Sequence, residues 1–229
     1  MHTWAVSVPE LSDSELSRLS SVCSRAELER SARFVFERDR RSYLAAHGLL
    51  RHALSDCEPE CAPSQWSFET RQYGRPELAG HLRSPLRFNL THCSTRVAVV
   101  VCRNVACGID VEPVLREADS ALLISKSLSE QEQAWVTAAG PELRTDRFLQ
   151  LWTLKEAISK AVGLGLRLPF AELDLDVSGP PVLRGAPPEA AGPWWLAQRR
   201  SADGHIEALA LQLPPGQPVA LSHHAWSPG

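Results

Sequence analysis

One short stretch constrains the fold of this chain more than any other: residues 108–112 read Gly-Ile-Asp-Val-Glu. Successive side chains of an extended strand point to opposite faces, so Asp110 and Glu112 project together from one face. The aliphatic residues between them face the core on the other side. Pro113 favours an end to the strand, because proline cannot donate to the hydrogen-bond ladder. The stretch therefore predicts a strand with a pair of carboxylates along one face.

The two carboxylates of this strand admit two interpretations. Neighbouring carboxylates repel each other unless a cation lies between them, and hard oxygen ligands of this kind suit Mg²⁺. The plainer alternative is a solvated strand edge with no ligand. The pentapeptide alone does not decide between them.

The order of the predicted elements favours an α+β fold over a doubly wound sheet, because strands and helices come in blocks. A chain of 229 residues fits one large domain or two small ones. We expect an N-terminal subdomain, 1–104, and a C-terminal subdomain, 105–229, that carries the carboxylates.

Local patterns place most of these elements. Ser12 with Glu15, Ser24 with Glu27, and Ser129 with Glu132 fit the capping box that starts a helix. Helical spacing of apolar residues predicts helices over 39–54 and 145–162, the second stopped by the Gly-Leu-Gly run at 163–165. Alternation predicts strands over 4–8, 66–69, 86–91, 96–102, 172–177, 194–200, 205–213 and 219–223, with a turn over 73–76.

Charge and composition limit the environment of the chain. The net charge of −3 is near balance, which argues against nucleic acid or an anionic membrane as a partner. No apolar run approaches the roughly 20 residues that span a bilayer. The six cysteines form no CxxC pair, so we expect reduced thiols and a cytoplasmic protein.

A second stretch, 152–160, reads Trp-Thr-Leu-Lys-Glu-Ala-Ile-Ser-Lys. On a helix, Trp152, Glu156 and Lys160 lie four residues apart and share one face. Glu156 with Lys160 alone would suit an ordinary solvated ion pair, worth about 0.2 to 0.5 kcal/mol. Together with the acidic strand, the helix can also complete a site for a charged substrate.

The combination of motifs resembles the 4′-phosphopantetheinyl transferases of the surfactin-synthetase type, the two-halved, monomeric group. That family carries a GIDxE strand followed by a WxxKExxxK helix, matched at 108–112 and 152–160. It also carries a YG-basic-P turn and an FN-x-[ST]-H strand end, matched at 73–76 and 88–92. Four motifs in the right order cover about residues 25 to 175.

The resemblance implies a pseudo-twofold pair of similar α+β subdomains, with coenzyme A bound in the cleft between them. It implies transfer of 4′-phosphopantetheine from coenzyme A to a serine of an apo acyl or peptidyl carrier protein, releasing adenosine 3′,5′-bisphosphate. The implied residues divide by role: Asp110, Glu112 and Glu156 hold Mg²⁺; Glu156, Asp110, Lys160 and His92 serve catalysis; Arg30, Arg41, Ser42, Arg75, Thr91, His92, Asp110 and Lys160 contact coenzyme A.

One departure from the family pattern is visible. A basic residue found in a member of the family three positions before Arg30 is Glu27 here, so that contact is absent or replaced, with Arg33 and Arg40 as candidates. Glu156 has two candidate roles, general base and metal ligand, and the sequence does not choose between them.

Two other classes of function stay open from the sequence. One is a different Mg²⁺-dependent phosphoryl enzyme, and the other is a non-catalytic binder that kept the fold. For a transferase, segment 114–136 is the expected docking surface for the carrier protein. Its apolar residues are Leu115, Leu122, Leu123, Ile124 and Leu128, with Arg116 and Lys126 nearby. Ordinary core packing of these leucines is the alternative.

Overall fold

The computed structural model describes residues 1–114, 121–214 and 216–226, so Leu115 and Arg116 lie outside it. Contacts divide the chain into two compact units. The first comprises 1–104 together with the residues from Pro218 onward, and the second comprises 105–217. The predicted second subdomain, 105–229, differs from the second unit by this last segment.

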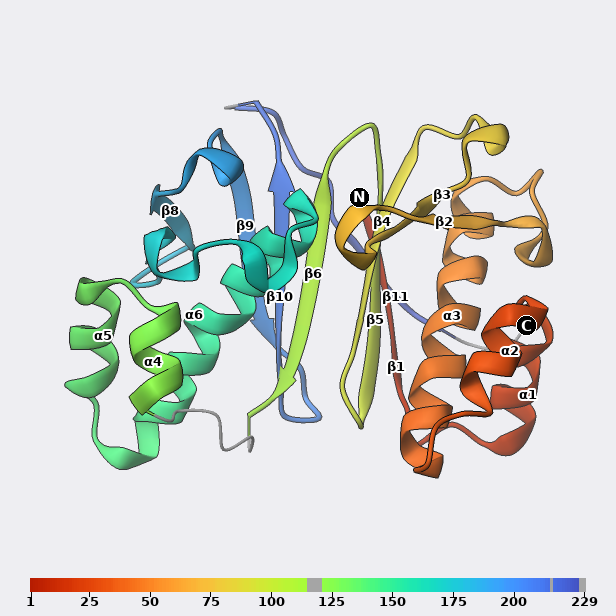
Figure 1. The fold of residues 1–229 in the computed structure, drawn as a ribbon, viewed down its shortest axis with the longest axis horizontal. Helices are drawn as coiled ribbons and strands as arrows, with labels where there is room; N and C mark the ends of the chain where they lie inside the picture. The colour runs from red at the N-terminus through yellow and green to blue at the C-terminus, as the bar shows by residue number, and fades with distance from the viewer. Residues whose placement is uncertain (115–120, 215, 227–229) are drawn as a thin grey trace. The chain divides into compact units, whose positions relative to one another are not determined.

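A four-stranded sheet in the order β11-β1-β5-β4 forms the first unit (Figure 1). Strands β1 (His2–Ser7) and β5 (Arg96–Arg103) pair antiparallel, and β5 pairs antiparallel with β4 (Leu86–His92). Strand β11 (Ser222–Ala225) pairs parallel with β1. The predicted second subdomain, 105–229, included this strand, whereas in the structure its pairing with β1 makes it the edge strand of the first sheet.

The long helix α3 (Glu37–Cys57) covers this sheet, and α1 (Asp13–Ser21) and α2 (Arg25–Ser31) pack against α3. The contact with α1 is very close. A Cβ atom added to Gly48 would lie 2.3 Å from the carbonyl oxygen of Leu19. Only glycine fits where the two helix backbones approach in this way.

A small hairpin, β2 (Phe68–Thr70) with β3 (Pro76–Leu78), completes the first unit. Its turn contains the short 3₁₀ helix η2 (Gln72–Gly74), in which Tyr73 has φ 71° and Gly74 has φ 88°. The turn predicted over 73–76 is present. Two further 3₁₀ helices are η1 (Pro63–Gln65) and η3 (Gly80–Leu82).

The second unit has its own antiparallel sheet, in the order β6-β10-β9. Strand β10 (His205–Gln212) lies between β6 (Cys107–Pro113) and β9 (Trp194–Arg200). The 22-residue helix α6 (Pro141–Val162) packs across β6 and β10. Each unit thus combines a largely or wholly antiparallel sheet with one long helix, which confirms the α+β class. The twofold relation stays a prediction.

Smaller elements surround α6. Helices α4 (Ala121–Ser127) and α5 (Glu130–Thr137) precede it, and the hairpin of β7 (Asp174–Asp176) with β8 (Val182–Gly185) follows it. The connections contain the 3₁₀ helices η4 (Gly165–Arg167), η5 (Phe170–Glu172) and η6 (Pro188–Ala190). Sequence periodicity did not predict α4, β3 or β8, each of which is seven residues or shorter.

Helix starts and stops follow the predicted signals. All three capping boxes are formed, with Ser12, Ser24 and Ser129 each accepting a hydrogen bond from the backbone amide three residues later. Gly163, in the left-handed region at φ 82°, caps the end of α6. Within the described chain, every helix is too short or too polar to cross a lipid bilayer.

Candidate active site

The backbone of α6 lies directly on strand β6 at Gly108. A Cβ atom built on this glycine would lie 1.9 Å from the carbonyl oxygen of Ala157 and 2.8 Å from the amide nitrogen of Ala161. Any side chain here would push the helix away from the strand. The position next to the predicted carboxylates must therefore be glycine for packing reasons alone.

The same geometry tells which face of β6 carries the carboxylates. Because side chains alternate along a strand, Gly108, Asp110 and Glu112 all face α6. Asp110 is buried, at 4 % exposure, whereas Glu112 is partly exposed. The two acidic residues of the pentapeptide therefore face the helix that carries the second motif.

An ion pair joins the two motifs. The ammonium nitrogen of Lys160 lies 2.6 Å from Oδ1 of Asp110, across 50 residues of sequence. The lysine side chain is one quarter exposed, so the pair lies at the rim of the packed region. The structure thus brings together two predicted site residues from separate elements.

A narrow stripe of α6 stays accessible. Between Leu151 and Ala161 the partly exposed residues are Trp152, Glu156 and Lys160, and all others are buried. This is the face predicted from the four-residue spacing. Trp152 stacks on Phe148, with ring centroids 5.7 Å apart.

The donor set fits a magnesium ion in its chemistry. Asp110 and Glu112 offer carboxylate oxygens from the α6 side of β6, and Glu156 offers another from the accessible stripe of α6. In the described residues, however, no three His, Cys, Asp or Glu side chains already stand close enough together to hold a metal ion. One oxygen of Asp110 is engaged by Lys160.

The first unit contains a hollow of about 600 Å³ lined by residues of α2, α3, the β2–β3 hairpin and β4. Arg30 lines it and places its guanidinium over the ring of Tyr43, 5.6 Å from the ring centroid. His92, at the end of β4, also lines it. Cationic and aromatic walls of this kind suit a nucleotide with a phosphate group.

Glu27 faces the same hollow but serves the protein itself. Its carboxylate accepts hydrogen bonds from the backbone amide of Ser24 at 2.7 Å, from His47 at 2.9 Å and from Arg51 at 2.9 Å. Burial would raise the pKa of this carboxyl, but the hydrogen bonds from His47 and Ser24 and the nearby charges of His47 and Arg51 lower it to about 2. Glu27 therefore joins α2 to α3 as an anion.

The sequence predicted one partner of Glu27, Ser24 in the capping box. It did not predict the other two, His47 and Arg51. His47 and Arg51 lie four residues apart, one helical turn, on α3. That spacing could have indicated a shared acceptor. Neither candidate replacement for the lost basic residue lines the same hollow: Arg33 lines a neighbouring one, and Arg40 pairs with Glu37.

Three predicted coenzyme A contacts have other partners or are buried. Arg41 donates to Oδ1 of Asp13 at 2.7 Å and to the carbonyl oxygen of Leu11 at 2.5 Å. Ser42 and Thr91 are both buried, and Ser42 donates to the carbonyl oxygen of Cys93 at 3.2 Å. The hollow that contains Arg30 is lined by none of the three.

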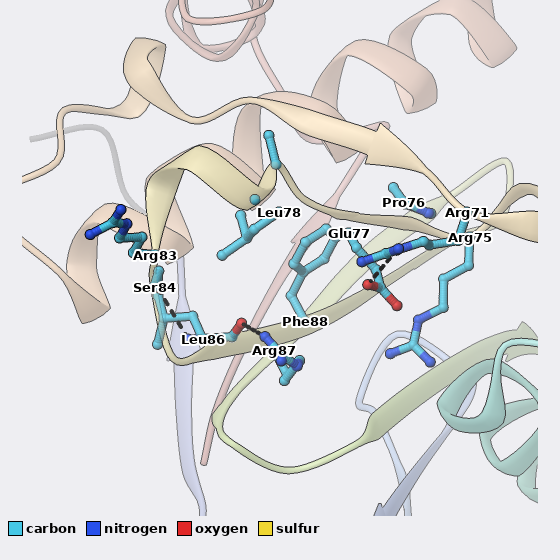
Figure 2. Close-up of a pocket in the computed structure, with 12 residues that line it drawn as sticks. Arg71, Arg75, Pro76, Glu77, Leu78, Arg83, Ser84, Leu86, Arg87 and Phe88 are labelled. Carbon is cyan, nitrogen blue, oxygen red and sulfur yellow. Dashed lines mark hydrogen bonds and ion pairs between the residues drawn. The ribbon is translucent and has the colours of Figure 1, made fainter.

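Arg75 lines a different, smaller hollow of about 200 Å³, which Figure 2 shows with four arginines around it. Arg71 is engaged there by Glu77 at 2.9 Å. Arg83 lies at the opposite end from Arg71 and Arg75, and its side chain points away from them (Figure 2). These arginines do not converge on one point.

Two family models match the chain, one after the other. Residues 9–104 match the model for the N-terminal part of 4′-phosphopantetheinyl transferase, and 106–210 match that for the 4′-phosphopantetheinyl transferase superfamily. The chain belongs to the 4′-phosphopantetheinyl transferases. This membership decides among the three classes of function considered from the sequence, and it makes the chain an enzyme of the holo-acyl-carrier-protein synthase type.

Named relatives of this transferase include two bacterial enzymes. The chain is 29 % identical to the 4′-phosphopantetheinyl transferase HetI of Nostoc over 213 residues, 92 % of this chain and 87 % of HetI. It is also 29 % identical to the transferase Sfp of Bacillus subtilis over 160 residues, 70 % of this chain and 69 % of Sfp. These relatives place the transferase in the two-halved type.

Among solved structures, the transferase is similar to a holo-(acyl-carrier-protein) synthase from Bacillus anthracis in complex with CoA (3′,5′-ADP). The TM-score is 0.39 and the identity 23 %, over 47 % of this chain and 95 % of that one.

Proposed function

We propose that this transferase moves the 4′-phosphopantetheine group from coenzyme A to a serine hydroxyl of an apo acyl or peptidyl carrier protein, with Mg²⁺ and release of adenosine 3′,5′-bisphosphate. The observation that carries the proposal is the 2.6 Å pair between Lys160 and Asp110. It brings the acidic strand and the WxxKExxxK helix together. The carboxylates and the lysine of these two motifs are the charged groups that binding a pyrophosphate with Mg²⁺ would require.

The acidic and the basic residues of the site have different proposed roles. Asp110, Glu112 and Glu156 would hold the magnesium ion, which would supply a Lewis acid for the pyrophosphate oxygens. Lys160 is a donor for the same anionic oxygens, and so is a ring N–H of His92. Asp110 engages Lys160 in the structure, and we propose that the lysine exchanges this partner for a phosphate oxygen when coenzyme A binds.

The transfer forms one bond and breaks one. The serine oxygen attacks the β-phosphorus, the bond from this phosphorus to the bridging oxygen breaks, and adenosine 3′,5′-bisphosphate leaves with the electron pair. The serine proton must go to a base, and Glu156 is the candidate because it comes from the helix opposite the acidic strand. The alternative role of Glu156, as a metal ligand only, stays open beside it.

The first unit supplies the proposed nucleotide contacts. Support comes from the hollow that contains Arg30 and His92, which offers cationic groups and an aromatic wall from Tyr43. We keep Arg75, Arg41, Ser42 and Thr91 as predicted contacts, although Arg41 and Ser42 already have protein partners. A monomer and a cytoplasmic location are likewise predictions.

Mass spectrometry tests the proposal directly. The purified protein is incubated with coenzyme A and several apo carrier proteins, with Mg²⁺ or with excess chelator. We expect a phosphopantetheine adduct on the carrier serine only when Mg²⁺ is present. An adduct of equal yield in chelator would contradict the magnesium site, and no adduct on any carrier would contradict the proposed substrate class.

A further inference from the structure

Lys155 belongs to the same helical motif as Glu156 and Lys160, yet its side chain points into the protein. It is fully buried, at 0 % exposure. Four oxygens lie within hydrogen-bond distance of its ammonium and share its three N–H donors. They belong to α4, α5 and the η5 region: the carbonyl of Ser127 at 2.9 Å, Oε2 of Glu132 at 2.5 Å, and the carbonyls of Phe170 at 2.8 Å and Leu173 at 2.7 Å.

The carboxylate of Glu132 is equally engaged. It accepts from the backbone amide of Ser129 at 2.7 Å and, through its other oxygen, from the backbone amide of Leu175 at 3.0 Å. Burial raises the pKa of Glu132 and lowers that of Lys155, while their mutual attraction acts the other way. The charged lysine offers three protons to the four acceptors around it, one more than the neutral amine would.

Stability alone does not account for this pair. Moving two charges out of water costs several kcal/mol per ion, and apolar residues of similar volume often replace such pairs without loss of stability. The surroundings of Lys155 are otherwise a hydrophobic core that includes Leu151, Leu154 and Ile158. An apolar residue would be easier to bury here than a charged pair, but the carbonyls of Ser127, Phe170 and Leu173 would lose their lysine donor.

The pair adds a directional constraint on the rotation of α6 about its axis, beside the close contact at Gly108 and the hydrogen bond from Gln198 to Thr153. Buried residues occur on almost every side of this helix, and hydrophobic attraction has no preferred direction. Hydrogen bonds are directional. Each residue turns a helix by about 100°, so the direction of Lys155 sets the directions of Glu156 and Lys160.

We propose that Lys155 is a positioning residue: its ion pair with Glu132 and its three bonds to backbone carbonyls hold α6 in the rotation that directs Glu156 and Lys160 toward the acidic strand. This inference rests on the proposed function, because it acts through the roles given there to Glu156 and Lys160.

The test compares variants of the full chain, assayed for kcat at saturating coenzyme A, Mg²⁺ and carrier protein. Lys155→Met removes the charge and keeps the length, and we expect at least a tenfold loss of kcat. The matched control is Leu154→Ala, a neighbouring core residue of the same helix. We expect it to lower the melting temperature and to leave kcat within about threefold of the wild type.

Lys155→Met leaves Glu132 as an unpaired buried charge and can fail to fold. The double variant Lys155→Met with Glu132→Leu removes both charges, and we expect it to fold and to show the same loss of kcat. A folded double variant with wild-type kcat would overturn the proposal.

A double-mutant cycle with Glu156→Gln separates positioning from a general structural effect. If Lys155 acts through Glu156 and Lys160, adding Lys155→Met to Glu156→Gln causes a clearly smaller loss than Lys155→Met causes in the wild type; a full additional tenfold loss would overturn the inference. The cycle also tells the two proposals apart. If Glu156→Gln alone keeps wild-type kcat, the proposed function fails at that residue. If Glu156→Gln is inactive while Lys155→Met keeps wild-type kcat, only the present inference fails.

Discussion

Lys160 and Asp110 form the direct link between the two sequence motifs, with Nζ and Oδ1 2.6 Å apart. We expect Asp110→Asn and Glu156→Gln each to lower the transfer rate by about 10²-fold or more, because each removes a charge from the group proposed to bind the metal and the pyrophosphate. Steady-state kinetics at saturating Mg²⁺ checks this, with melting temperatures to confirm folding. Glu112→Gln is the milder comparison, because water can take its place on a metal. Normal turnover of the Asp110 and Glu156 variants would remove these residues from the site.

Gly108→Ala tests the close packing of α6 on β6. The new Cβ would stand 1.9 Å from the oxygen of Ala157, so the helix must shift. We expect a loss of about 1 to 3 kcal/mol in the free energy of unfolding and a lower kcat, measured by urea denaturation and transfer assay. Gly179→Ala is the control, since open space surrounds that glycine. Equal stability of the two variants would argue against the contact.

Glu27→Gln tests the charge that joins α2 to α3. The folded protein lowers the pKa of this carboxyl from 4.5 to about 2, so its contribution is present above pH 4.5 and is lost as the pH falls toward 2. We expect the variant to be less stable by roughly 2 kcal/mol at pH 7, after allowing for solvent screening, and to match the wild type near pH 2. Glu29→Gln, at an exposed ion pair with Arg25, is the control and should change stability by less than about 1 kcal/mol.

Arg30→Ala tests the proposed nucleotide end of the site. We expect a higher KM for coenzyme A with a nearly unchanged kcat, because the 3′-phosphate is remote from the reacting phosphorus. With dephospho-coenzyme A as donor, the difference from wild type should vanish. Arg25→Ala, on the same helix but outside the hollow, should leave both KM values unchanged. If the KM of the Arg30 variant were also raised with dephospho-coenzyme A, Arg30 would not act through the 3′-phosphate.

Leu122→Ser tests the predicted docking segment for the carrier protein. Leu122 is 63 % exposed, whereas Ile124 and Leu128 are buried, so the alternative of core packing holds for those two residues. We expect a several-fold higher KM for the carrier and no change in coenzyme A binding. Leu166→Ser, at a residue 77 % exposed on η4, is the control. If the two variants had equal KM values for the carrier protein, Leu122 would not belong to the docking surface.

Local signals in the sequence predicted much of the fold. Capping boxes and the glycine stop at Gly163 are short-range effects, and they located helix ends closely. The partner of β11 could not be predicted, because strand pairing depends on backbone contacts about 220 residues apart. Short elements such as α4 have too few residues for a clear period.

The sequence predicted the charged residues of the candidate site better than it predicted the buried contacts that hold them in place. The spacing of Trp152, Glu156 and Lys160 indicated the accessible face of α6. Nothing in that spacing showed that Lys155 would be buried, because a lysine on a helix is usually solvated. Its acceptors come from three separate segments of the chain, which only the folded structure brings together.

The parallel pairing of β11 with β1 has a consequence for anyone who divides this protein. The chain passes from the first unit to the second near residue 104 and returns near residue 217. A gene fragment that ends at residue 104 would lack β11 and would leave the outer edge of β1 without its backbone partners. Such bare edges recruit other chains, so we expect this fragment to aggregate on expression. A soluble version would need the terminal strand fused back, for example through a short linker after residue 104.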